Sequence, residues 1–114
     1  MADGLDREYI ADFSDKDRLR VRFKTKPEQK PTYAVMLECQ FIELKDQWIQ
    51  VMRLDDWDGC PHIDRAYPDG TVSKEWLPDT GNNKINTSRA VAWAKSNWEK
   101  ERERYESQLK QSGQ

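Results

Sequence analysis

The sequence predicts an α+β fold in which an antiparallel sheet of four or five strands forms a meander and a C-terminal helix packs across one face. Two observations support this prediction. Residues 18–77 consist of short apolar or alternating runs separated by turn residues, as in consecutive antiparallel strands. Residues 87–109 instead repeat apolar side chains at helical spacing.

The N-terminal segment, residues 1–17, fits either a short helix or a strand, because its few apolar residues fall at helical spacing in a short acidic stretch. Residues 18–25 alternate strictly, with Leu19, Val21 and Phe23 on one side, which predicts a half-buried strand. The two prolines within residues 26–31 cannot donate ladder hydrogen bonds and predict a hairpin loop.

The next strand, residues 32–43, is apolar on both faces and is therefore predicted to be central. Shorter strands are predicted at 48–54, 63–67 and 72–77. The final helix is expected to begin at Asn86, Thr87 or Ser88 as N-cap and to leave a frayed tail at 110–114. Its sheet-facing stripe comprises Ala90, Val91, Ala94, Trp98, Tyr105 and Leu109.

The composition fits a single domain spanning residues 1–114. Hydrophobic residues make up 36% and charged residues 35%, with five Trp, four Tyr and three Phe, which indicates a thin core built on large aromatic side chains. The net charge of −2 gives no global attraction for a polyanion, so any nucleic-acid binding has to come from a local patch. With no signal peptide or long apolar run, Cys39 and Cys60 are expected to be reduced thiols in a cytoplasmic protein without a membrane partner.

Residues 51–64 contain the only histidine and a group of aspartates. Side chains at 58, 60, 62 and 64 (Asp, Cys, His, Asp) would share one face of a strand, but Gly59 and Pro61 disfavour a regular strand. Zinc also requires a second ligand pair that the chain lacks, so we expect no metal and no cofactor. Magnesium held by Asp55, Asp56 and Asp58 is an alternative to solvated turns.

His62 has an unperturbed pKa near neutrality, so it is a candidate general acid or base. We take as candidate catalytic residues His62, Arg53, Asp55 and Asp64: the arginine would hold a phosphate and an aspartate would orient the imidazole. The alternative is a structural histidine hydrogen-bonded to a neighbouring aspartate.

The polar face of residues 18–25 is a candidate nucleic-acid surface. It carries Arg18, Arg20, Arg22 and Lys24, spaced about 7 Å apart along an extended strand, close to the spacing of phosphates in extended RNA. Two alternatives are that the charges protect an edge strand from pairing with another molecule, or that they pair with Glu38 and Glu43.

A protein-binding surface is the other candidate. Trp93 lies nearly opposite the apolar stripe of the predicted helix, so on a lone helix it would be exposed, and an exposed tryptophan is a common interface anchor. Trp57 and Asp58, in the acidic turn, complete the candidate partner-binding set.

A longer string of residues carries a family resemblance. It runs from Trp48 through Arg53-x-Asp55, Gly59-x-Pro61-His62-x-Asp64, Pro68-Asp69-Gly70, Lys74 and Leu77 to Asn97-Trp98-Glu99 and Tyr105. This string resembles a family of small archaeal and bacterial proteins that is similar to the TumE-type toxins of toxin–antitoxin pairs. Asp58 and Asp64 stand where those toxins usually have histidines, so the chain departs from the histidine cluster of the family.

The resemblance implies a toxin-like protein of a toxin–antitoxin or defence locus, with RNA as a candidate target and an antitoxin as protein partner. The alternative is a non-catalytic interaction module that acts as an inhibitor or as a subunit of a larger assembly.

Overall fold

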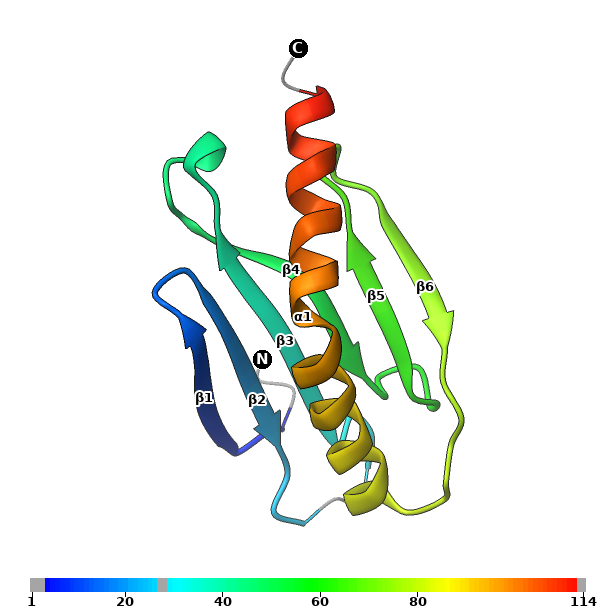
Figure 1. The fold of residues 1–114 in the computed structure, drawn as a ribbon. Coiled ribbons are helices and arrows are strands. Elements are labelled where there is room, and N and C mark those ends of the chain that lie inside the picture. The colour runs from blue at the N-terminus through cyan, green and yellow to red at the C-terminus, as the bar shows by residue number, and fades with distance from the viewer. Residues whose placement is uncertain (1–3, 27–28, 113–114) are drawn as a thin grey trace.

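The computed structural model describes residues 4–26 and 29–112. One six-stranded antiparallel sheet carries a single long helix on one face (Figure 1). The strands are β1 (Arg7–Ser14), β2 (Asp17–Phe23), β3 (Tyr33–Gln40), β4 (Trp48–Asp55), β5 (His62–Ala66) and β6 (Val72–Trp76), followed by helix α1 (Asn83–Ser112). A short 3₁₀ turn, η1 (Ile42–Leu44), joins β3 to β4. The strands pair in chain order, so the predicted α+β meander is confirmed.

The number of strands was predicted slightly too low, because the ambiguous N-terminal segment forms a sixth strand. β1 pairs with β2 along its length, from Arg7 opposite Phe23 to Ser14 opposite Asp17. As an edge strand it buries little, and Tyr9 and Ile10 are largely exposed, so its sequence lacks a clear period-2 signal. Residues 1–3 lie outside the described part of the chain.

The alternation predicted for β2 is present. Leu19 and Val21 are fully buried and Phe23 is half-buried against the same core, because this face of the strand points toward the helix. β2 is not an edge strand, since β1 and β3 flank it. The central position predicted for residues 32–43 is also correct, although the strand ends at Gln40 and Ile42 begins η1.

A bulge in β4 changes which face its first residues occupy. Leu37 pairs with Met52 but Glu38 pairs with Gln50, so Val51 is the extra residue of the bulge. Both Val51 and Met52 are buried. Without the bulge, Trp48 would lie on the same face as Met52, toward the helix. The extra residue moves Trp48 to the opposite face, where the guanidinium of Arg18 stacks on its ring at 3.8 Å.

Helix α1 begins earlier than predicted, at Asn83. The side chain of Asn82 accepts a hydrogen bond from the backbone N–H of Ile85 at 3.1 Å, so Asn82 serves as the N-cap in place of residues 86–88. The Asn86 side chain is instead held by Thr80 and Asp79. The helix also continues to Ser112, three residues beyond the predicted end at residue 109, and 113–114 lie outside the described residues.

The predicted helical stripe does face the sheet. Ala90, Ala94 and Tyr105 are buried, and Trp98 stacks on Phe13 of β1 with ring centroids 4.7 Å apart. No helix within residues 4–26 and 29–112 combines the length and apolarity that a membrane span requires.

Helix α1 covers one face of the sheet, and we call the other the open face (Figure 1). Leu5 shields part of it, packing on Ala34 and Met36 of β3. One face of an antiparallel sheet commonly remains in water, but this one presents exposed tryptophans and a buried polar cluster, so it is the place to look for a functional site.

Candidate functional site

The four candidate catalytic residues meet on the open face, where β4 lies beside β5. In the sheet register Arg53 stands opposite Asp64, and Asp55 stands opposite His62. Because alternate residues of a strand share a face, this register brings all four side chains together. We call them the His62 cluster, and they are the sequence-predicted set of Arg53, Asp55, His62 and Asp64.

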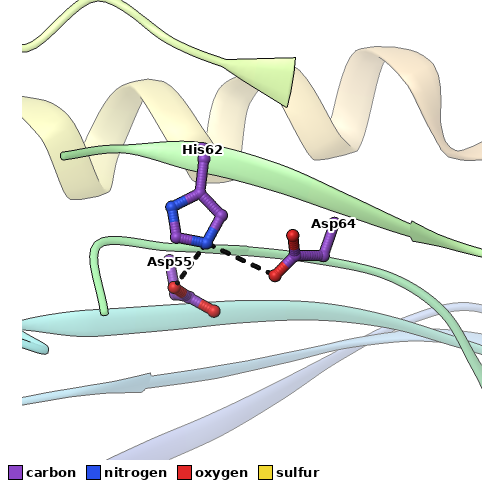
Figure 2. A group of neighbouring side chains, drawn as sticks. All are labelled: Asp55, His62 and Asp64. Carbon is purple, nitrogen blue, oxygen red and sulfur yellow. Dashed lines mark ion pairs between the residues drawn. The ribbon is translucent and has the colours of Figure 1, made fainter. Parts of the chain in front are cut away.

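Figure 2 shows the imidazole of His62 between two carboxylates. Its Nε2 lies 3.0 Å from Asp55 Oδ1 and 3.3 Å from Asp64 Oδ2. The other oxygen of Asp55 accepts a hydrogen bond from Arg53 Nε at 2.6 Å, and the backbone N–H of Trp57 donates to Asp55 Oδ1 at 2.9 Å. The Asp55 carboxylate is therefore fixed from three sides.

His62 is not placed as a general acid or base would be. The ring is 1% exposed, its Nδ1 lies 2.9 Å from the backbone oxygen of Cys60, and its Nε2 faces the two carboxylates. Neither ring nitrogen faces solvent, so the expected proton transfer to a substrate finds no open atom here. The parts of the cluster that a ligand can reach are Asp64 and Arg53, whose side chains are about a quarter exposed.

The guanidinium of Arg53 is suited to hold an anion. Its Nε bonds Asp55, while Nη1 has only the sulfur of Met36 at 3.9 Å. In the described part of the chain neither Nη donates a hydrogen bond to a carboxylate or carbonyl oxygen. The terminal nitrogens of this planar fork therefore retain N–H groups that a phosphate or carboxylate could accept.

The other aspartates of the acidic turn do not join the cluster. Asp56 is fully buried and accepts from the backbone and hydroxyl of Thr32, and Asp58 is an exposed ion-pair partner of Lys74. The hydrogen bond from Lys74 lowers the pKa of the Asp58 carboxyl. The side chains of Asp55, Asp56 and Asp58 therefore do not converge on one site, as magnesium binding by these three residues would require.

The alternating set of residues 58, 60, 62 and 64 is separated as well. Cys60 is an exposed free thiol, and only its backbone oxygen contacts the His62 cluster. β5 begins at His62, after Gly59 and Pro61, which agrees with the argument that these residues disfavour a regular strand.

Three of the four predicted nucleic-acid residues also lie on the open face. Arg18, Arg20 and Arg22 project from β2, but they are matched by carboxylates. Arg18 and Arg20 pair with Glu38, and Glu8 of β1 pairs with Arg20 and Arg22. Glu43 lies exposed in η1, so the expected pairing with Glu38 is found and Glu8 replaces Glu43. Lys24 follows β2 and donates to the backbone oxygen of Gln29.

Trp93 is not exposed, contrary to the sequence prediction. It is half-buried against the core and lines a small cavity with Tyr33 and Leu77, and the guanidinium of Arg65 lies over its ring. The prediction treated the helix as isolated, whereas β5 and the loop after β6 extend the contact to this side of α1. Trp57 is 57% exposed, as an interface residue would be, and Asp58 is exposed beside Lys74.

Sequence reasoning missed two aromatic residues of the open face, Trp48 and Trp76. Trp76 stands opposite His62 in the register and is 58% exposed. Its alternation with Lys74 along β6 was a usable signal, because residues two apart share a face. The exposure of Trp48 depends on the β4 bulge, for which the sequence has no comparable signal.

A protein-family model described as a domain of unknown function, DUF7718, matches residues 4–111. No curated protein and no solved structure matches the chain. The matched range contains all six strands and nearly all of helix α1, so the open face and the His62 cluster both lie within it. The chain belongs to the DUF7718 family.

Proposed function

We propose that this protein is a small cytoplasmic toxin-like protein directed at RNA, and that it binds single-stranded RNA on the open face of its sheet. The observation that carries the proposal is the meeting of the His62 cluster, the Arg18–Arg22 stripe and two exposed tryptophans on one uncovered face. An antitoxin that covers this face would be its natural protein partner.

The aromatic residues supply the first part of RNA recognition. Trp48 lies at the start of β4, where Arg18 covers one face of its ring, and Trp76 lies on β6 beside His62. Both indoles are partly exposed to solvent. Unpaired bases stack on such rings with about 1 to 3 kcal/mol per base, largely without regard to sequence.

The arginines supply the second part. Arg53, Met36 and Arg20 lie in one row across β4, β3 and β2, so the open guanidinium nitrogens of Arg53 continue the cationic stripe toward the cluster. A phosphate that binds Arg53 would lie beside Asp64, whose partner in β6 is Lys74. Trp76 belongs to the next row on the same face, opposite His62.

The direct test uses a fluorescein-labelled single-stranded RNA of about 12 nucleotides in a fluorescence anisotropy titration. Trp76→Ala should weaken binding about tenfold, and Arg53→Ala should weaken it and lower the slope of log K against log salt by about one. Arg89→Ala removes an exposed arginine from the helix side and should leave binding unchanged. Equal binding by all four proteins would contradict the proposal.

Growth on expression provides the cellular arm of the test. Wild-type protein should slow growth, Arg53→Ala should relieve the effect, and co-expression of the neighbouring gene product should rescue the wild type. A wild-type protein that neither binds RNA nor affects growth would refute the RNA-directed function.

A second candidate is a non-catalytic interaction module, an inhibitor or a subunit of an assembly. The pairing of Arg18, Arg20 and Arg22 with Glu8 and Glu38 favours it, because these carboxylates neutralise the stripe that would attract phosphates. Tryptophan and arginine together are also the usual anchors of protein interfaces. A stable complex with the neighbouring gene product that Trp76→Asp disrupts, without any RNA binding, would select this candidate.

A further inference from the structure

We propose that the His62 cluster binds one divalent first-row metal ion through Asp55 Oδ1, His62 Nε2 and Asp64 Oδ2. This inference deepens the proposed function, on which it rests for its chemical purpose. The binding itself follows from the donor groups, their spacing and the contacts that hold them.

The hydrogen-bond partners of the imidazole leave a lone pair of Nε2 directed at two carboxylates. Nδ1 lies 2.9 Å from the backbone oxygen of Cys60, which can only accept, so Nδ1 carries the hydrogen. A neutral imidazole has a single N–H, and its Nε2 then directs a lone pair at the two carboxylates. This arrangement requires a proton or a metal cation between Nε2 and the oxygens.

The distances from Nε2 to the two carboxylate oxygens match those between neighbouring ligand atoms of a metal ion. Nε2 lies 3.0 Å from Asp55 Oδ1 and 3.3 Å from Asp64 Oδ2, and each of the three residues offers a ligand atom within 4.8 Å of the other two. Around an ion bound at about 2.1 Å, neighbouring ligand atoms are about 3.0 Å apart at octahedral angles and about 3.4 Å apart at tetrahedral angles. The two contacts of Nε2 therefore have the length of ligand-to-ligand edges.

The ligand side chains are themselves held by hydrogen bonds to groups behind them. Histidine ligands of metals commonly donate their second ring N–H to a backbone carbonyl, and ligating carboxylates are held by further hydrogen bonds. Both features are present, because Cys60 O takes Nδ1–H while Arg53 and the Trp57 amide hold Asp55. His62 is fully buried and Asp64 is partly exposed, so an ion would be held from inside and remain open on one side.

The donor set indicates the class of ion. One imidazole and two carboxylates suit Mn²⁺, Fe²⁺ or Zn²⁺, whereas Mg²⁺ prefers oxygen ligands and several waters. Three protein ligands leave coordination positions for a phosphate oxygen, and the open nitrogens of Arg53 lie beside them. The metal would thus give the open face a second, stronger contact to the RNA backbone than arginine alone.

The test uses Mn²⁺ and Zn²⁺ with the full chain. Calorimetry should find one Mn²⁺ per chain, and NMR should show the imidazole resonances of the single histidine broadened by Mn²⁺ and shifted by Zn²⁺. Asp64→Asn removes a partly exposed ligand and should weaken binding at least tenfold. Asp12→Asn, an exposed carboxylate on β1, should bind as the wild type does.

No saturable binding of Mn²⁺ up to about 1 mM, or equal affinity in Asp64→Asn and wild type, would overturn the metal site. Retained circular dichroism of Asp64→Asn shows that a loss of binding is not unfolding. RNA binding that persists in EDTA, by a protein that binds no metal, would refute this inference and leave the proposed function standing. Metal binding without RNA binding or a growth effect would support the metal site and refute the proposed function.

Discussion

The indole of Trp76 meets the imidazole of His62 edge to face, with ring centroids 5.4 Å apart. The two residues are direct cross-strand partners on β6 and β5, so the exposed ring on the edge strand is part of the cover over the buried histidine. Any ligand that stacks on Trp76 is therefore adjacent to the His62 cluster.

Trp76→Ala should uncover His62. We expect the free energy of unfolding to fall by about 1 kcal/mol, the usual value of an aromatic pair, and the rate of carbethoxylation of the single histidine by diethyl pyrocarbonate to rise severalfold. Urea unfolding and absorbance at the modified imidazole measure the two effects. Trp57→Ala serves as the control, and an equal rise in that variant would contradict the shielding role of Trp76.

The register of β2 predicts opposite outcomes for neighbouring positions. Val21 is 1% exposed, so Val21→Asp should destabilise by about 3 kcal/mol or more, because the new carboxylate is buried without a partner. Arg20→Ser should cost less than about 1 kcal/mol, since the pairs of Arg20 with Glu8 and Glu38 are partly exposed and Arg18 still neutralises Glu38. Urea denaturation measures the free energy of unfolding of both variants. A larger loss in Arg20→Ser than in Val21→Asp would show that the register is wrong.

The two tryptophans of helix α1 should behave alike. Trp98 stacks on Phe13, and Trp93 packs against the core beneath Arg65, so replacing either half-buried ring by alanine should cost about 2 kcal/mol. Iodide quenching of single-tryptophan variants provides the matching measurement. A Trp93 as accessible as Trp57 would restore the sequence-based expectation that it is an exposed anchor.

The two cysteines should differ sharply in reactivity. Burial raises the pKa of the Cys39 thiol, which is fully shielded in the core, so its reactive thiolate is scarce at neutral pH. Cys60 is exposed and should react with DTNB in the native protein, with the second thiol appearing only on unfolding. Two thiols titrated at similar rates without denaturant would contradict the packing of β3.

Sequence patterns were sufficient to predict the orientation of an element where one of its faces is buried. The alternation of Leu19, Val21 and Phe23 fixed the orientation of β2, and the helical stripe through Ala94 and Trp98 fixed that of α1, because burial penalises the wrong face of each. For β1 the sequence left helix and strand both open, because it is a half-exposed edge strand. The position of Trp48 on the open face depends on a bulge at Val51, which no local sequence pattern predicts.

The residues of the His62 cluster could be predicted from the sequence, but their arrangement in space could not. Arg53 and Asp55 share a face by period 2, as do His62 and Asp64. Their meeting depends on the β4–β5 register, which the turn of residues 56–61 sets. Two hydrogen bonds between residues distant in sequence hold that turn. The backbone N–H of Thr32 donates to the Asp56 carboxylate, and the Lys30 ammonium donates to the Gly59 carbonyl.

The central claim, that the open face is the functional face, is tested most directly by NMR chemical-shift mapping with single-stranded RNA. Amide resonances of β4, β5 and β6 around Arg53, His62 and Trp76 should shift together and saturate with one RNA, while the exposed residues of α1 stay unchanged. Shifts confined to helix α1, or no saturable shifts on the open face, would contradict the account.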